Sequence, residues 1–140
     1  MTRKPSKEGG TPMEIVGKKS LGLDVACLEK DKVVILKMND PSLNFYVTDT
    51  LKETLKEILN AKIDEGYKTF VLNMGKVKVI DSCGVGLIIA ANNLAESRQG
   101  KLCLTNIKPF ITKIFEIMRI HKHLNIYETE EEALREICSP

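Results

Sequence analysis

Residues 69–97 read TFVLNMGKVKVIDSCGVGLIIAANNLAES, and this stretch decides the fold class. Its first four residues, TFVL, form a short continuous apolar run, which is typical of a strand at the centre of a sheet. A polar turn around Asp81 follows. From Gly84 to Ser97, alanines and aliphatic residues cover most of the circumference of a helix. The stretch therefore predicts a strand, a turn and a largely buried helix.

The rest of the chain continues this alternation of strands and helices. Residues 23–28 and 33–38 are expected to form two strands joined by the polar turn EKDK, so the pair predicts a hairpin. Further strands are expected at 102–104 and 125–127, with helices at 51–66, 109–118 and 129–137. The order β-β-α-β-α-β-α-β-α predicts an α/β domain. Its sheet is expected to be mixed and mostly parallel, with about five strands and about four helices.

Two capping boxes of the form S/T-x-x-E predict helix starts. Thr50 with Glu53 precedes an apolar stripe of leucines and isoleucines, and Thr129 with Glu132 precedes the last helix. In such a box the hydroxyl and the carboxylate accept hydrogen bonds from free backbone amides at the helix start. Gly66 is expected to end the first helix, because glycine readily adopts the left-handed conformation found there.

The length and composition predict one domain. The chain has 140 residues, of which 43% are hydrophobic and 29% charged, with a net charge of +2. Residues 1–20 lack periodicity and are expected to be a flexible tail, so that the domain spans 21–140. The small and dispersed charge predicts no direct binding of nucleic acid. The longest apolar run, 85–91, is too short to cross a membrane, so we expect no membrane insertion and a cytoplasmic location.

The cysteines and histidines predict neither a metal site nor a cofactor. The four cysteines are Cys27, Cys83, Cys103 and Cys138, and the two histidines are His121 and His123. No two cysteines lie close together in the sequence, whereas zinc sites normally use close pairs of ligands. We expect reduced, mostly buried thiols, as in a cytosolic protein.

The turn IDSCGVG, Ile80–Gly86, admits four interpretations. A phosphate-binding loop would need the Walker pattern or GxGxxG, and neither is present. The nucleophile motif GxSxG would need a glycine at position 80, where the chain has isoleucine. A nucleophilic Cys83 would need a base, and nothing in the sequence brings His121 or His123 near it.

The two remaining interpretations are a helix cap and a phosphate acceptor. Since Asp81 follows a strand and Gly84 opens a helix, Ser82 or Cys83 is expected at or near the N-cap, where a serine oxygen accepts a free amide. The same serine would be exposed and accessible to a kinase. The two roles are compatible, because a helix start favours added negative charge.

A phosphate on Ser82 would act on a partner interface rather than on the fold. It adds about −1.5 to −2 charges. A full charge about 4 Å from a partner carboxylate costs on the order of 4 kcal/mol at an effective dielectric constant of about 20. Such a cost corresponds to nearly three decades of affinity.

The block TFVLNMGKVKVIDSCGVGLIIAANNLAESRQGKLCLTNI resembles the centre of the STAS domain, found in the anti-sigma factor antagonist family. The later stretch IHKHLNIYETEEEAL resembles that family's ending, so the resemblance covers about residues 23–137. It implies a protein that binds an anti-sigma factor, which is also a serine kinase, and so releases a sigma factor. Phosphorylation by that kinase breaks the complex, and a serine phosphatase restores the free form.

Carried onto this chain, the resemblance implies that Ser82 is the phosphorylation site. It also implies that Gly84 and Gly86 let backbones approach closely at the helix start. The implied partner-binding residues are Asp81, Cys83, Gly84, Val85, Gly86, Leu43 and Asn44. Many members have Gly-x-Leu-Asp after the second strand, where this chain has Pro41-Ser42-Leu43-Asn44. Asn44 keeps the shape of aspartate without its charge, and Cys83 stands where serine or threonine is common.

We therefore expect a bacterial-type, cytoplasmic phosphoprotein that regulates sigma-factor-dependent transcription by binding and is not an enzyme. Its expected partners are an anti-sigma factor serine kinase and a serine phosphatase. The alternative is a STAS scaffold or interaction subunit that does not switch, in an assembly like the stressosome or as an accessory subunit of lipid transport. A hydrolase using Ser82 or Cys83 is not expected.

Overall fold

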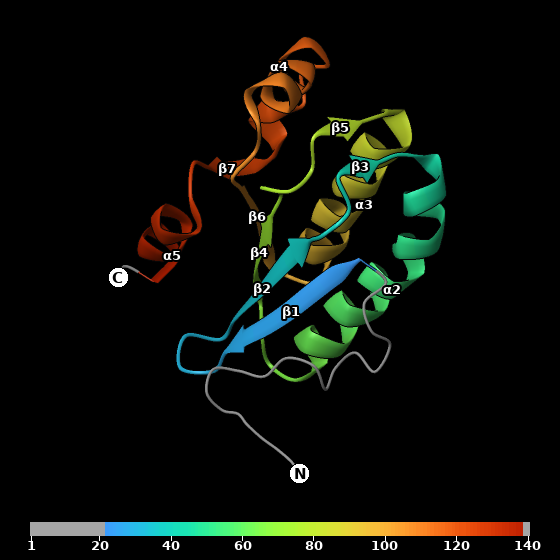
Figure 1. The fold of residues 1–140 in the computed structure, drawn as a ribbon. Helices are drawn as coiled ribbons and strands as arrows, with labels where there is room; N and C mark the ends of the chain where they lie inside the picture. Colours follow the sequence, from blue (N-terminus) through green and yellow to red (C-terminus); the bar gives the residue numbers. More distant parts are fainter. Residues whose placement is uncertain (1–21, 139–140) are drawn as a thin grey trace.

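The computed structural model describes residues 22–138, so the expected tail over residues 1–20 lies outside the described residues. The elements in chain order are β1 (Leu23–Leu28), β2 (Val33–Met38), β3 (Ser42–Leu43), α2 (Phe45–Asp64), β4 (Thr69–Asn73), β5 (Val79–Ile80), α3 (Ser82–Ser97), β6 (Lys101–Thr105), α4 (Pro109–Ile117), the 3₁₀ turn η1 (His121–His123), β7 (Asn125–Tyr127) and α5 (Glu130–Cys138). Figure 1 shows their arrangement. The expected order is confirmed, and two short strands, β3 and β5, are added to it.

The main sheet has five strands in the order β1-β2-β4-β6-β7. β1 runs antiparallel to β2, and the pairs β2–β4, β4–β6 and β6–β7 are parallel. The predicted mixed, mostly parallel sheet is thus confirmed. β4 lies at its centre, which explains why the apolar run that begins at Thr69 is continuous rather than alternating.

The sheet is covered on both faces (Figure 1). Helices α2 and α3 pack side by side on one face, where Leu55, Leu59 and Ile88 join the larger apolar core. α4 adds Phe115 to the same core. α5 covers the opposite face, where Ala133 packs in a smaller apolar cluster.

Helix α2 begins six residues earlier than the sequence predicted. Its N-cap is Asn44, whose side-chain oxygen accepts the amide of Val47 at 3.1 Å. The prediction that Thr50 caps this helix is therefore wrong. Thr50 lies inside the helix, where its hydroxyl donates to the carbonyl of Val47 at 3.1 Å. The exposed start of α2 carries little of the apolar stripe, and for this reason the stripe indicated too late a start.

Other helix ends agree with the sequence. Gly66 has φ +106°, and its amide donates to the Ile63 carbonyl while that of Tyr67 donates to the Lys62 carbonyl, both at 3.0 Å. These two bonds make the Schellman ending expected at a glycine. Thr129 caps α5, since its hydroxyl accepts the amide of Glu132 at 3.0 Å.

Among residues 22–138, no helix combines the length and hydropathy needed to span a bilayer.

Candidate functional site

Two helix starts meet at the carboxylate of Asp81. One oxygen, Oδ1, accepts the backbone amides of Cys83 at 2.9 Å and Gly84 at 3.1 Å, which makes Asp81 the N-cap of α3. The other oxygen, Oδ2, accepts the amide of Phe45, the first residue of α2, at 3.0 Å. The expected position of Ser82 near the N-cap is confirmed, since Ser82 is the first helical residue, but the expected capping group is corrected: the capping oxygen belongs to Asp81 and not to the serine.

This meeting point is built by the small parallel sheet of β3 and β5. Leu43 is paired with Ile80, so the next residue of each strand, Asn44 and Asp81, stands at the same level. Each of these residues is the N-cap of the helix that follows. The chain therefore presents two strand–cap–helix units side by side. Asparagine and aspartate are about equally favoured at an N-cap, so Asn44 fills this position as well as an aspartate would.

Gly84 allows the first turn of α3 to pack directly on β3. A Cβ atom at this position would lie 2.3 Å from the carbonyl oxygen of Leu43 and 2.6 Å from Cγ1 of Ile80. The close backbone approach expected at Gly84 is thus confirmed. At Gly86, no described atom outside its chain neighbours and the adjacent backbone of its own helix lies within 4 Å of the corresponding point, so the expectation of close approach there is wrong. Gly86 is exposed instead.

The residues expected to bind a partner are unequally accessible. Asp81, Ser82, Cys83 and Gly86 are exposed and Asn44 is half-buried, whereas Leu43, Gly84 and Val85 are buried. The buried residues can support a partner surface only indirectly, by holding the two helix starts in place. Their direct contact with a partner remains a prediction, and it would require the helix starts to open.

Three exposed apolar side chains beside these residues escaped the sequence reasoning. Phe45 is 52% exposed, Tyr46 79% and Val79 49%. The rings of Phe45 and Tyr46 meet edge to face, 5.4 Å between centroids. Phe45, Tyr46, Val79, Asp81, Ser82, Cys83 and Gly86 together are called the Ser82 face. A usable signal was present, since two of the chain's seven Phe and Tyr residues directly follow Asn44.

The site lacks the partners that a nucleophile needs. Among residues 22–138, no side chain is hydrogen-bonded to the hydroxyl of Ser82 or the thiol of Cys83. The backbone of His123 contacts Asn92, which lies nine residues, or roughly 13 Å, along α3 from Cys83. The arrangement therefore supports binding, with an exposed hydroxyl at its centre, rather than acid–base catalysis.

The thiols differ in accessibility. Cys103 is buried in the sheet, and burial raises the pKa of its thiol to about 11. Cys83 is exposed and Cys27 is half-buried. The expectation of mostly buried cysteines therefore holds for Cys103 and is wrong for Cys83. The side chain of Cys138 lies outside the described residues.

Comparison with known proteins gives one family. The family model described as STAS domain matches residues 25–133. A candidate anti-sigma factor antagonist of Bordetella bronchiseptica, BtrV, is 32% identical over 75 residues. That match covers 54% of this chain and 65% of the relative, so the chain spans less than two thirds of that protein's length.

Solved structures share the fold. The crystal structure of a candidate anti-sigma factor antagonist from Thermotoga maritima has a TM-score of 0.72 at 25% identity, covering 84% of this chain and 95% of that one. The Bacillus cell fate determinant SpoIIAA in its phosphorylated form has a TM-score of 0.59 at 19% identity, covering 82% and 98%. A sulfate transporter family protein from Wolinella succinogenes has a TM-score of 0.65 at 26% identity, covering 76% and 84%. The fold is therefore not confined to antagonists.

Proposed function

Since this chain belongs to the STAS domain family, we propose that it is an anti-sigma factor antagonist switched off by phosphorylation of Ser82. Unphosphorylated, it binds an anti-sigma factor that is also a serine kinase, and so regulates transcription that depends on a sigma factor. A serine phosphatase restores the binding form. The antagonists of this family act by binding, and the protein is not an enzyme.

The observation that carries the proposal is the position of Ser82. Its side chain is exposed in the first turn of α3, directly after Asp81, whose carboxylate caps α3 and also accepts the first amide of α2. The hydroxyl has no structural partner among the described residues, so a kinase can modify it without breaking a bond of the fold. The phosphorylated form of SpoIIAA has the same fold, which is consistent with a domain that tolerates this modification.

A phosphate at this position is expected to leave the fold intact. The start of a helix carries about half a positive elementary charge, which favours an anion there. The modified group would change the Ser82 face instead. It adds about −1.5 to −2 charges beside Asp81, whose carboxylate binds the amide of the exposed Phe45. A partner that buries these apolar side chains would have to desolvate the phosphate as well, which is unfavourable without a paired cation.

The proposed switch does not require the aspartate that the resemblance to the family implies at position 44. Asn44 caps α2 as aspartate would, and it lies next to Phe45, whose amide is bound by Asp81. An acid at position 44 would place a second carboxylate at the same pair of helix starts. Its absence lowers the negative charge near Ser82, so the relative effect of an added phosphate on the local charge is larger.

A capture experiment tests the proposal. Wild type, Ser82→Ala and Ser82→Asp proteins are immobilised and exposed to an extract of the cells from which the protein comes. We expect wild type and Ser82→Ala to retain one serine kinase that Ser82→Asp does not retain. Adding Mg-ATP should then release the kinase from wild type, with one phosphate mapped to Ser82 by intact mass and peptide analysis, but not from Ser82→Ala.

Ser97→Asp is the matched control, because it places the same charge on the exposed far end of the same helix. It should retain the kinase as wild type does. Equal retention by Ser82→Asp, together with no phosphate on Ser82, would contradict the proposal. If the purified protein then also formed stable oligomers by light scattering, the STAS scaffold that does not switch would replace it.

A further inference from the structure

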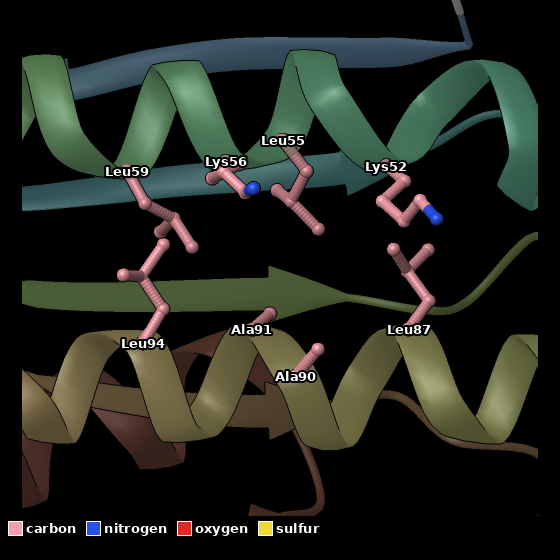
Figure 2. A pocket seen from close by; sticks show the side chains of 8 residues that line it. All are labelled: Lys52, Leu55, Lys56, Leu59, Leu87, Ala90, Ala91 and Leu94. Carbon is pink, nitrogen blue, oxygen red and sulfur yellow. The ribbon is translucent and has the colours of Figure 1, made fainter.

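An apolar groove runs along the surface between α2 and α3 (Figure 2). Leu59 of α2 and Leu87 and Leu94 of α3 point into it from the two sides, and Ala90 leaves it open to solvent. Its lining is almost entirely hydrocarbon. No element of residues 22–138 covers it. Water in such a groove has few polar partners, so an apolar group that enters it gains by the hydrophobic effect.

The size of the groove limits what can enter. It offers about 100 Å³ of accessible space. Pockets for small-molecule ligands and cofactors usually have about 300–1,000 Å³, and an engineered cavity of about 150 Å³ holds a benzene molecule. The groove is therefore too small for a cofactor or a long acyl chain. It matches one branched aliphatic side chain, such as that of leucine.

The charge at the rim indicates what accompanies that side chain. Lys52 and Lys56 lie one turn apart on α2 and line the edge of the groove. Lys56 has an exposed carboxylate neighbour, Glu53, at 3.7 Å. Within residues 22–138, the ammonium group of Lys52 has no carboxylate within 4 Å. An incoming carboxylate can pair with Lys52 without displacing an existing partner.

The groove lies next to the Ser82 face. Both helices start there, and Leu87 is five residues, or roughly 7.5 Å, along α3 from Ser82. Lys52 is seven residues, or roughly 10 Å, along α2 from Phe45. A protein that covers the Ser82 face with an interface of ordinary size, about 800 Å² per partner, extends over this distance.

We propose that the groove receives one aliphatic side chain of the partner that covers the Ser82 face, from a segment that carries a carboxylate beside that side chain. The inference rests on the proposed function, because the partner is the anti-sigma factor kinase. The aliphatic group fills the space between α2 and α3, and the carboxylate pairs with Lys52. The contact adds affinity that does not depend on the Ser82 hydroxyl itself.

A fragment that mimics a leucine side chain with an adjoining carboxylate tests the groove without a partner. 4-Methylpentanoate is titrated into ¹⁵N-labelled protein, and amide shifts are followed by NMR. We expect saturable shifts at Leu87, Ala90 and Ala91 with a dissociation constant in the millimolar range. Neutral 4-methylpentanamide should bind at least threefold more weakly. Lys52→Gln should weaken the binding of 4-methylpentanoate by a similar factor.

Ala90→Leu is the decisive variant, because it places a side chain of the protein's own into the groove from an exposed position. It should abolish the fragment shifts, whereas Ala61→Leu, the same change at an exposed position of α2 outside the groove, should leave them unchanged. Absence of saturable shifts in wild type, or equal shifts in Ala90→Leu, would overturn the proposal.

The capture experiment separates the two proposals. Ala90→Leu and Lys52→Glu should weaken retention of the kinase at least tenfold, while Ala61→Leu and Lys113→Glu, an exposed lysine of α4, should not. If Ser82→Asp loses the kinase and Ala90→Leu retains it fully, the groove proposal is overturned and the proposed function stands. If the fragment binds as expected but Ser82→Asp behaves like wild type, the groove is supported and the phosphorylation switch is overturned.

Discussion

Helices α2 and α3 are joined at both ends, but by different kinds of contact. At their starts, the Asp81 carboxylate accepts backbone amides of both helices. At their ends, Arg98 of the α3 C-cap donates to the side chains of Asn60 at 2.9 Å and Asp64 at 2.8 Å on α2. The first junction joins a side chain to backbone amides, whereas the second joins the Arg98 side chain mainly to side chains of α2, including an ion pair whose groups are partly exposed.

The difference explains why the starts, and not the ends, are suited to carry a switch. Amides at a helix start have no partner within the helix, so Asp81 satisfies donors that would otherwise be unpaired. The backbone is thereby held in place without using the Ser82 hydroxyl. The exposed ion pair at the ends adds modest stability. We expect changes at the starts to cost more stability than changes at the ends.

The largest effect is expected from Gly84→Ala. The new methyl group would meet the Leu43 carbonyl, a backbone atom that cannot move aside without shifting β3. Overpacking of this kind costs about 3 kcal/mol. Gly86→Ala, two residues on with open space, should instead stabilise by up to about 1 kcal/mol, because alanine favours helix. Urea unfolding of both variants measures the difference, and equal effects would show that the start of α3 is not closely packed.

Asp81→Ala is expected to cost about 2 kcal/mol, since losing an N-cap costs about 1 kcal/mol and the bond to the Phe45 amide is lost as well. Asp81→Asn should cost about half as much, because an amide has one acceptor oxygen instead of two. Thermal unfolding followed by circular dichroism gives both values. If Asp81→Asn were as stable as wild type, the bond to Phe45 would contribute nothing and the two starts would be independent.

Arg98→Ala is expected to cost about 1 kcal/mol or less, because exposed ion pairs contribute little. The loss should shrink in 1 M salt, which screens exposed charges. The loss caused by Asp81→Ala should change less with salt, since it arises from missing backbone bonds. Parallel urea titrations at low and high salt compare the two ends, and equal salt dependence would contradict the distinction.

The smallest effect concerns pH and Lys62, which is 8% exposed near the end of α2. Burial lowers the pKa of Lys62, but the hydrogen bond to Glu65 and the charges of Cys27 and Glu65 raise it by more, so the pKa lies above its usual 10.5. A raised pKa contributes stability that is complete below pH 10.5 and is lost as pH rises through the folded-state value. Lys62→Met should therefore lose less stability than wild type between pH 8 and pH 11.

That difference between wild type and Lys62→Met is expected to be less than about 1 kcal/mol. Tyr67, whose pKa is raised chiefly by burial, contributes in the same direction. Because Tyr67 is present in both proteins, the stability of each should fall between pH 8 and pH 11. Urea midpoints at the two pH values provide the measurement. Parallel curves for the two proteins would show that the lysine charge does not stabilise this end.

Short-range signals in the sequence predicted part of the site correctly. Thr129 and Gly66 act as expected, because a capping hydroxyl and a left-handed glycine depend on residues only a few positions away. Thr50 begins the same S/T-x-x-E pattern as Thr129 but lies within a helix, since Asn44 caps that helix six residues earlier. A capping motif shows that a helix can start at a residue, and the surrounding structure selects between competing starts.

The sequence by itself determined the order of strands and helices, the parallel sheet and the exposed turn that contains Ser82. These follow from apolar periodicity and from the residues that begin and end each element, which act over short distances along the chain. Only the tertiary structure decided that the Asp81 carboxylate binds amides of two helices, that Phe45 and Tyr46 are exposed at the start of α2, and that a groove opens beside Lys52. Each depends on α2 and α3 lying side by side, and the pairing of β3 with β5 brings their starts together across 36 residues of sequence.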